Sequence, residues 1–355
     1  MKILIDIGHP AHVHYYKNFI RIMESKGHSF FVTARDRECV KELLNYEDIN
    51  FVSRGKGAKS TTGRIYYLTK ATMLILLYSL RFKPDILLGH GSIYAALAAM
   101  MIGKPCVLTS DTDSTKVHKQ LIKIISVLLS PSCFRYKYGV KHILFDGFME
   151  MMYLHPNYFN TNRDLIENYL PNNSKKNVLM RFVSWDAYHD KNISGLPNDL
   201  KKKLVETLEP HCNIFISSEN KMDNYLEKHR IKIPPYLMHS FINCMDMFIG
   251  ESATMTSEAA LLGVPAIYYD CYGRGYTDEE EKYGLVYNYR CTDGLIEQAT
   301  KLSLSPNLKK SKFRNLKRLL KNKIDPTAFL VWFIECFPDS KYKMWRSAKT
   351  QYKFK

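Results

Sequence analysis

The sequence predicts an α/β protein made of two doubly wound domains in series. Short apolar runs alternate with amphipathic stretches along most of the 355 residues, which is the pattern of parallel strands joined by helices. The expected strands are nearly continuous apolar runs, as a sheet covered by helices on both faces requires. A polar stretch at residues 156–176 interrupts the pattern, which then begins again. The length also favours two domains over one.

The elements follow in order along the chain. In the first half we expect strands at residues 3–7, 30–33, 85–88, 106–109 and 142–145, with helices at about 13–26, 64–81 and 92–101. In the second half we expect strands at residues 178–183, 213–217, 247–249 and 266–269, with helices that include 199–208 and 256–262. A last helix at about 326–337 is apolar almost throughout and must be buried. The predicted organisation is an N-terminal domain (1–160), a linker (161–176), a second domain (177–324) and a final segment (325–355).

Composition excludes several classes of protein. With 46% hydrophobic and 13% aromatic residues the chain can bury a core, so it is not disordered. It contains no run of eighteen apolar residues, and its first ten residues resemble a strand entering a loop more than a signal peptide. The eight cysteines form no C-x-x-C pair, which fits a reducing compartment. We therefore expect a cytoplasmic protein.

The net charge of +16 is concentrated in two segments. Residues 51–145 contain 14 basic and 3 acidic side chains, and residues 301–355 contain 15 and 3. Apolar positions beside lysines at 116–128 and in the tail at 341–355 would suit an anionic membrane surface, although the tail could equally be disordered. For the apolar run at 73–77 an ordinary buried helix is the better interpretation. Nucleic-acid binding is a minor alternative, because no recognition motif accompanies the charge.

The strongest local pattern is G-E-S-A-T-M-T-S-E-A-A-L-L-G-V-P-A at residues 250–266. A strand delivers the hydroxyl residues Ser252, Thr254 and Thr256 to the first turn of a helix. Free backbone N–H groups and the helix dipole favour an anion there, such as a diphosphate. Glu258, further along this helix, could accept both hydroxyls of a ribose. The alternative is a capped helix without a ligand.

The helix around Glu258, followed by Gly263 and Pro265, resembles the donor-nucleotide segment of GT-B glycosyltransferases. That group includes the peptidoglycan N-acetylglucosaminyltransferase and the non-hydrolysing UDP-N-acetylglucosamine 2-epimerases. Four further stretches, at residues 8–14, 83–92, 153–159 and 181–190, resemble an uncharacterised prokaryotic family of GT-B-like proteins. The resemblance covers nearly the whole chain. It implies an acceptor domain first, a nucleotide domain second, a cleft between them and a C-terminal helix that crosses back.

Two segments of the first domain are candidates for catalysis. In the loop G-H-P-A-H-V-H, His12 resembles the histidine of the peptidoglycan transferase and is the first choice of base, with His9 second. Helix capping and metal binding are the alternatives for these histidines. Asp111 aligns by resemblance with an acidic loop facing the acceptor, where it could orient or replace His12. An Asx turn is the alternative for Asp111.

The resemblance also implies that Arg181 and Ser184 reach the donor phosphates, although a surface arginine and a turn serine remain the alternative. The full set expected to bind the donor is Arg181, Ser184, Gly250, Glu251, Ser252, Thr254, Met255, Thr256 and Glu258. We expect no metal and no cofactor, because the nucleotide-sugar, UDP-linked by resemblance, is itself the substrate.

The predicted activity is that of a metal-independent, inverting glycosyltransferase in cell-surface polysaccharide biosynthesis. Its acceptor would be a carbohydrate or a lipid-linked glycan, and the protein would lie peripherally on the inner face of the membrane. A nucleotide-sugar 2-epimerase or hydrolase is the alternative. Epimerisation is less favoured, because residues 89–92 read Gly-His-Gly-Ser where the epimerases carry Gly-Asp-Thr.

Overall fold

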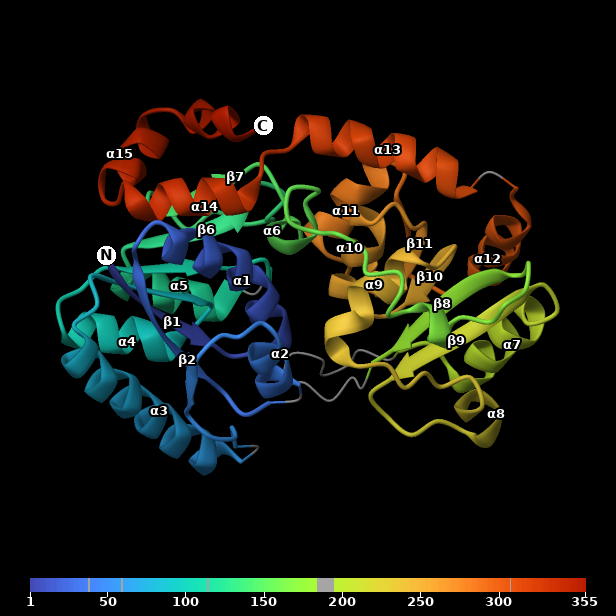
Figure 1. The fold of residues 1–355 in the computed structure, drawn as a ribbon, viewed down its shortest axis with the longest axis horizontal. Helices are drawn as coiled ribbons and strands as arrows, with labels where there is room; N and C mark the ends of the chain where they lie inside the picture. Colours follow the sequence, from blue (N-terminus) through green and yellow to red (C-terminus); the bar gives the residue numbers. More distant parts are fainter. Residues whose placement is uncertain (38, 59, 114, 184–194, 307) are drawn as a thin grey trace. The chain divides into compact units, whose positions relative to one another are not determined.

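The computed structural model describes residues 1–355 except 38, 59, 114, 184–194 and 307. The chain forms two compact units (Figure 1). The first unit consists of Met1–Tyr158 together with Lys323–Lys355, and the second of Phe159–Asn322. The segment 161–176, which we expected to be a linker, therefore belongs to the second unit. The final segment, Lys323–Lys355, belongs to the first unit.

The first unit contains a sheet of seven parallel strands in the order β3-β2-β1-β4-β5-β6-β7. Its strands are β1 (Lys2–Ile7), β2 (Ser29–Ala34), β3 (Phe51–Ser53), β4 (Ile86–His90), β5 (Cys106–Thr109), β6 (Val127–Pro131) and β7 (His142–Phe145). The strand order reverses between β1 and β4. In open α/β sheets, ligands bind at such a switch point, beyond the carboxyl ends of the strands.

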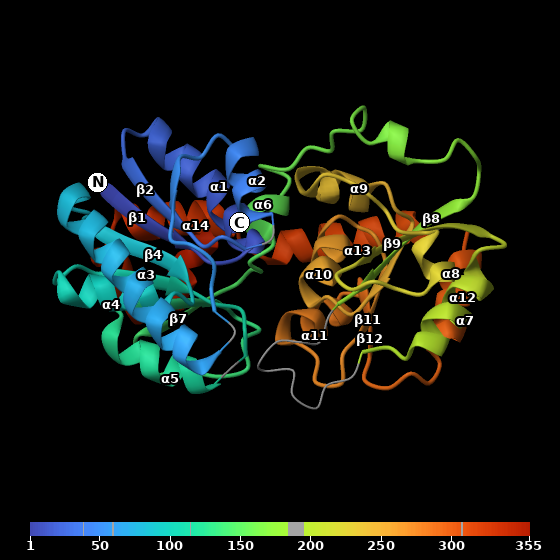
Figure 2. The same ribbon diagram turned by 90° about the horizontal axis from the view of Figure 1, so that it is seen from below.

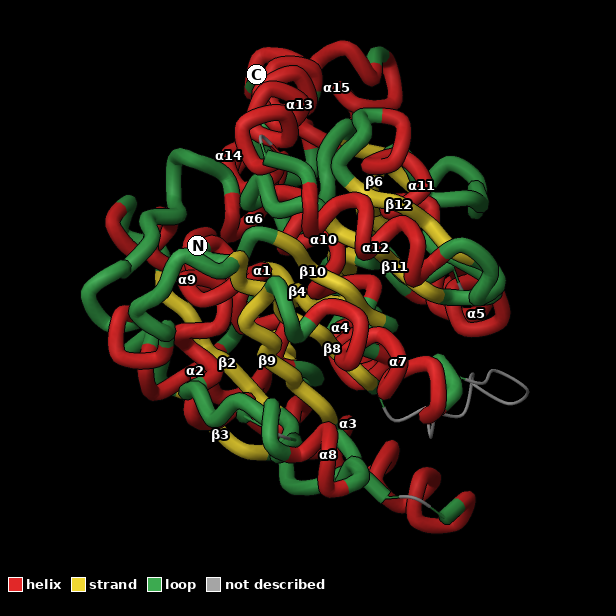
Figure 3. Tube along the Cα trace, turned by 90° about the vertical axis from the view of Figure 1, so that its right-hand side faces the viewer, coloured by secondary structure: helices red, strands yellow, loops and turns green. Residues whose placement is uncertain are grey.

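Helices cover both faces of this sheet (Figures 2 and 3). They are α1 (Pro10–Ser25), α2 (Val40–Tyr46), α3 (Thr61–Phe82), α4 (Ile93–Met101), α5 (Thr115–Ile124), α6 (Met151–Leu154), α14 (Pro326–Glu335) and α15 (Asp339–Arg346), followed by the 3-10 helix η3 (Ala348–Phe354). Helix α14 packs on α1 and α6, where Phe329 and Phe333 are buried. This packing confirms that the apolar helix near the C-terminus is buried. The tail, for which disorder was one alternative, is helical.

The second unit contains five parallel strands in the order β12-β11-β10-β8-β9, with the switch point between β8 and β10. The strands are β8 (Lys176–Phe182), β9 (Cys212–Ser218), β10 (Met247–Gly250), β11 (Ala266–Tyr269) and β12 (Val286–Tyr289). The helices are α7 (Asn198–Leu208), α8 (Asn224–Glu227), α9 (Met238–Asn243), α10 (Ala253–Leu261), α11 (Gly275–Lys282), α12 (Leu295–Leu304) and α13 (Leu308–Asn322), with short 3-10 helices at Glu167–Tyr169 and Pro235–Leu237.

The structure corrects several expectations about individual elements. Strands β3, β6 and β12 were not predicted. Leu128, the last of the apolar positions that we placed beside lysines at 116–128, lies in β6, because α5 ends at Ile124 and the apolar run after it forms a buried strand. The helical period continued into that run by coincidence of spacing, so the sequence pattern alone did not mark the boundary.

Helix α3 exposes apolar side chains that we expected to be buried. Ile75 is fully buried, but Met73 is 44% exposed and Leu77 is 59% exposed. Ile65, Tyr66 and Leu80 are also exposed on this helix. Within the described part of the chain, no helix is both long enough and apolar enough to span a bilayer.

Candidate functional site

The switch point of the first sheet gathers polar side chains from three loops. Strand β1 leads into the histidine loop and α1, β4 ends at His90, and β5 leads into Asp111. Because β1, β4 and β5 are adjacent parallel strands, their carboxyl ends lie along one edge of the sheet. The three loops therefore converge although they are far apart in sequence.

His9 and His12 have different local roles. His9 caps α1, since its Nδ1 accepts the N–H of Ala11 at 3.2 Å, which agrees with the capping alternative for this residue. His12 Nδ1 accepts the N–H of Gly8 at 3.2 Å. Burial, followed by the nearby His90 and His9, lowers the pKa of His12 well below its usual value. A neutral His12 that accepts at Nδ1 carries its proton on Nε2, which is then a hydrogen-bond donor.

Asp111 is the centre of the cluster. His90 Nε2 lies 3.1 Å from Asp111 Oδ1, and the Tyr15 hydroxyl donates to Oδ2 at 3.1 Å. The rings of His12 and His90 are 4.7 Å apart. Burial alone would raise the pKa of Asp111, but the charge and hydrogen bond of His90, with the bond from Tyr15, lower it overall. Asp111 is therefore an ionised carboxylate held by fixed donors.

A buried ion pair lies next to this edge of the sheet and stabilises it. Asp6, at the end of β1, accepts Arg54 Nε at 2.8 Å and the Ser92 hydroxyl at 2.5 Å, and both charged side chains are fully buried. The guanidinium lies under the histidine loop, where a Cβ on Gly8 would come within 3.5 Å of it. Removing one partner of such a pair costs about 3–5 kcal/mol. The pair therefore fixes the loop that presents His12.

The described residues of the set expected to bind the donor lie near the switch point of the second sheet. Gly250 pairs with Arg181 across β10 and β8, and a Cβ on Gly250 would lie 2.8 Å from the Arg181 carbonyl oxygen. Only glycine permits this approach. The Arg181 guanidinium donates to Ser217 Oγ at 2.8 Å and to Glu219 Oε1 at 2.5 Å. Ser184 lies outside the described residues.

Glu251 anchors the chain around this switch point. Its buried carboxylate accepts the N–H of Val183 at 2.9 Å and the N–H of Leu196 at 2.5 Å, and Lys201 Nζ lies 3.6 Å away. These bonds tie the start of α10 to the chain on both sides of residues 184–194. Glu251 thus has a structural role in this part of the unit.

The first turn of α10 has the geometry of a capped helix, which was the alternative for this segment. Ser252 caps the helix by accepting the N–H of Met255 at 3.4 Å, whereas Thr256 is buried and donates to the Ser252 carbonyl at 2.8 Å. Ser252, Thr254 and Met255 are partly exposed. Glu258 is buried, with His239 Nε2 of α9 at 3.0 Å from its Oε1.

No cluster of three or more His, Cys, Asp or Glu side chains that could hold a metal ion occurs among the residues that the structure describes. Metal binding was an alternative for the histidine loop, but the described residues offer no set of metal ligands there.

The sequence matches one known protein family and one curated relative. Residues 1–325 match the family described as "Protein of unknown function (DUF354)", and the protein belongs to it. An uncharacterized relative, MJ0665 of Methanocaldococcus jannaschii, is 23% identical over 290 residues, which cover 77% of this chain and 82% of the relative.

Solved structures show which fold this is. MnaA of S. aureus, in a co-structure with UDP, has a TM-score of 0.67 at 14% identity, with 96% of this chain and 97% of that chain covered. The UDP-GlcNAc 2-epimerase of M. jannaschii, in complex with UDP-GlcNAc and UDP, has a TM-score of 0.62 at 14% identity, covering 90% and 100%. The Streptomyces sp. SF2575 glycosyltransferase SsfS6 has a TM-score of 0.58 at 11% identity, covering 94% and 99%. The fold is that of GT-B glycosyltransferases and UDP-GlcNAc 2-epimerases.

Sequence reasoning missed several residues of these clusters. His90 was noted only because it replaces an aspartate of the epimerases, and Tyr15, Asp6 and Arg54 were not singled out at all. The polar ends of the strands at 3–7 and 85–88 were a usable signal, because both ends fall at the carboxyl edge of a parallel sheet. His239 lies in α9, which was not among the expected helices, so its pairing with Glu258 had no sequence signal.

Proposed function

We propose that this protein is a metal-independent glycosyltransferase that moves a sugar from a nucleotide-sugar, UDP-linked by analogy, to a carbohydrate or lipid-linked acceptor in cell-surface polysaccharide biosynthesis. The observation that carries the proposal is the Asp111 carboxylate at the switch point of the first sheet, held ionised by His90 and Tyr15. A transferase needs such a base to take the proton from an acceptor hydroxyl.

Asp111 is better suited to the role of base than His12, which was our first choice. The proton of neutral His12 resides on Nε2, because Nδ1 accepts the Gly8 N–H, so this ring would donate a hydrogen bond to a sugar oxygen. Both nitrogens of His90 are engaged, with Asp111 and with Thr109 Oγ1 at 3.1 Å. His90 would therefore hold Asp111 in place and keep it charged.

The donor would bind at the switch point of the second sheet. The N-terminus of α10 would receive the diphosphate, with Ser252 and Thr254 beside it, and Arg181 would add positive charge. This charge would stabilise the leaving nucleotide as the glycosidic bond breaks. Glu258 would hold the ribose if its pairing with His239 leaves one carboxylate oxygen for the ligand.

A UDP-sugar 2-epimerase is the second candidate, and one observation favours it. The end of β4 carries His90 where the epimerases carry a carboxylate, but Asp111 reaches the same place from β5. A carboxylate is thus present near the end of β4 after all, although a different strand supplies it.

One experiment separates the two candidates. The protein is incubated with UDP-GlcNAc in EDTA, and the sugar signals are followed by proton NMR before and after adding a lipid-linked oligosaccharide extract. A transferase leaves the donor intact until the extract is added and then releases UDP. Formation of the C2 epimer without any acceptor establishes the epimerase, and release of free sugar without acceptor establishes a hydrolase.

Peripheral membrane binding would suit a lipid-linked acceptor, and α3 supports it. This helix presents Tyr66, Met73, Leu77 and Leu80 at spacings that place them along one exposed face. Arg64, Lys70 and Arg81 lie on the same helix, which contains no acidic residue. An exposed apolar stripe among basic residues is typical of a helix lying on anionic lipid, where each basic residue contributes about 1 kcal/mol.

A further inference from the structure

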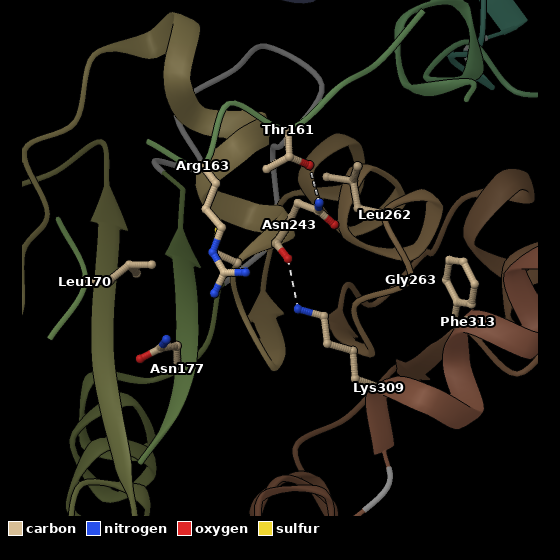
Figure 4. A pocket seen from close by; sticks show the side chains of 10 residues that line it. Thr161, Arg163, Leu170, Asn177, Asn243, Leu262, Gly263, Lys309 and Phe313 are labelled. Atoms are coloured by element: carbon tan, nitrogen blue, oxygen red, sulfur yellow. Dashed lines mark hydrogen bonds between the residues drawn. The ribbon is translucent and has the colours of Figure 1, made fainter. Parts of the chain in front are cut away.

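The second unit contains a cavity that the proposed reaction does not use. Its volume is about 560 Å³, within the usual range of small-molecule sites. Leu170 lines one side, and Leu262 and Phe313 line the other (Figure 4). The cavity lies near Asn177, at the start of β8, and Cys244, just before β10. It is therefore at the amino edge of the parallel sheet, whereas α10 begins at the carboxyl edge.

Two cations face this cavity. Arg163 and Lys309 point toward one another across it (Figure 4). The Lys309 ammonium donates to the carbonyls of Asn243 at 2.9 Å and Met245 at 3.1 Å, which leaves one of its three protons for a ligand. The Arg163 guanidinium makes no hydrogen bond or ion pair with any described residue, and no described residue that lines the cavity is acidic.

Arg163 and Lys309 bring two like charges to one cavity. The pKa of Lys309 is lowered mainly by desolvation of its ammonium; Asp246 opposes this shift, and the positive charge of Arg163 adds a smaller lowering. Two like charges that share a cavity favour an oxyanion between them. A guanidinium fork suits two phosphate oxygens, and an ammonium on the other side suits a third. A carboxylate has no third oxygen to offer.

We infer that this cavity is a second ligand site, which binds the phosphate group of a small organic phosphate between Arg163 and Lys309 and its apolar portion against Phe313 and Leu262. The inference is independent of the proposed transfer reaction, because every residue named here lies away from the carboxyl edge of the sheet. A ligand bound at this site would regulate the second unit, or the site would serve to bind a second metabolite.

Phenyl phosphate is a suitable probe, because its ring can lie against Phe313. We expect isothermal titration calorimetry with the full chain to show that phenyl phosphate binds more tightly than inorganic phosphate or benzoate. Arg163→Gln and Lys309→Met should each weaken this binding about tenfold or more, the effect of losing one charge-assisted hydrogen bond. Lys310→Met is the matched control, since Lys310 is the next residue of α13 but does not line the cavity.

The cysteines of the chain report where the probe binds. Cys244 lines the cavity, whereas Cys271 and Cys291 are exposed and follow β11 and β12 at the carboxyl edge. At about ten times its Kd, phenyl phosphate should slow alkylation of Cys244 by iodoacetamide about tenfold, as measured by peptide mass spectrometry, and leave the other two unchanged. Protection of Cys271 and Cys291 instead, or binding that neither substitution weakens, would overturn the inference. If Cys244 alkylates too slowly to follow, the effects of the substitutions on affinity decide.

Discussion

His90 and Asp111 are joined by a 3.1 Å hydrogen bond between side chains that leave neighbouring strands, β4 and β5. The bond, with the charge of His90, keeps the pKa of Asp111 below its usual value despite burial. The hydrogen bond thus links Asp111, which we propose to be the base, to His90, which holds it in place.

Replacing His90 should therefore change the pH dependence of the reaction as well as its rate. In His90→Gln the pKa of Asp111 rises, so the acid limb of the pH–rate profile moves to higher pH. Tyr15→Phe removes one hydrogen bond but no charge, and should shift the limb in the same direction by less. Asp111→Asn should lower kcat about 100-fold or more, the usual contribution of a general base. An acid limb that stays in place in His90→Gln would show that Asp111 is not the titrating base.

Nucleotide binding should be visible as thermal stabilisation. At about a hundred times its Kd, one of UDP, GDP, CDP or dTDP should add about 2.7 kcal/mol to the free energy of unfolding and raise Tm, with EDTA present or absent. Glu258→Gln should lose the shift, because a neutral amide is a poorer acceptor for ribose hydroxyls. His12→Ala in the first unit should keep it. If no nucleotide raises Tm, the proposed donor site is wrong.

Glu251→Ala tests whether Glu251 stabilises the fold or contacts the donor. Removing the carboxylate leaves the N–H groups of Val183 and Leu196 without their acceptor, so the free energy of unfolding should fall by about 2–4 kcal/mol in urea titrations. Glu251→Gln keeps one carbonyl oxygen and should lose less. A variant as stable as the wild type that no longer responds to nucleotide would instead indicate direct contact with the donor.

Glu280 should make stability depend on pH. It is fully buried in α11, where burial raises its pKa to about 8 despite a hydrogen bond from Ser257. Its pKa in the unfolded chain is about 4.5, so the folded state binds more protons between that pH and 8. This group therefore destabilises the fold progressively as pH rises from about 4.5 to about 8, by up to a few kcal/mol.

Glu280→Gln removes the titration. Compared with the wild type, the variant should gain stability at pH 9 relative to pH 5, as measured by urea unfolding at both values. Glu279→Gln on the same helix is the matched control and should change the profile only slightly, because Glu279 is not buried and its charge makes the smallest contribution to the raised pKa of Glu280. Parallel pH profiles for wild type and Glu280→Gln would contradict a raised pKa.

Membrane binding can be assigned to one face of the first unit. Helices α3 and α15 lie on opposite sides of its sheet (Figure 1), so a flat membrane cannot contact both. Met73→Glu with Leu77→Glu should abolish co-sedimentation with anionic vesicles. Tyr342→Glu with Trp345→Glu, which alters exposed aromatic residues of α15, should leave it unchanged. The reverse result would move the membrane face to α15, and no sedimentation of the wild type would exclude membrane binding by either helix.

Much of the fold was predictable because parallel strands covered on both faces are apolar runs bounded by turns. Strand β3 was not predicted because it has only three residues, all of them half-buried. Strand β6 was not predicted because its apolar run follows directly on an amphipathic helix. In the first sheet, the sequence indicated that His12 and Asp111 follow strands, but their convergence depends on the strand order β1-β4-β5. Local patterns do not contain that order. For the same reason, the bond between Glu251 and the chain near residues 183 and 196 had no sequence signal.

The return of the last segment to the first unit has a consequence for biosynthesis. The second unit, Phe159–Asn322, is one uninterrupted stretch, whereas the first unit needs both ends of the chain. Until the ribosome has made α14, the surfaces of α1 and α6 on which this helix packs remain uncovered. The second unit can therefore complete its folding during translation, before the first. A nascent chain stalled at about residue 325 would expose an apolar surface to chaperones, and a truncated product ending there would be expected to aggregate.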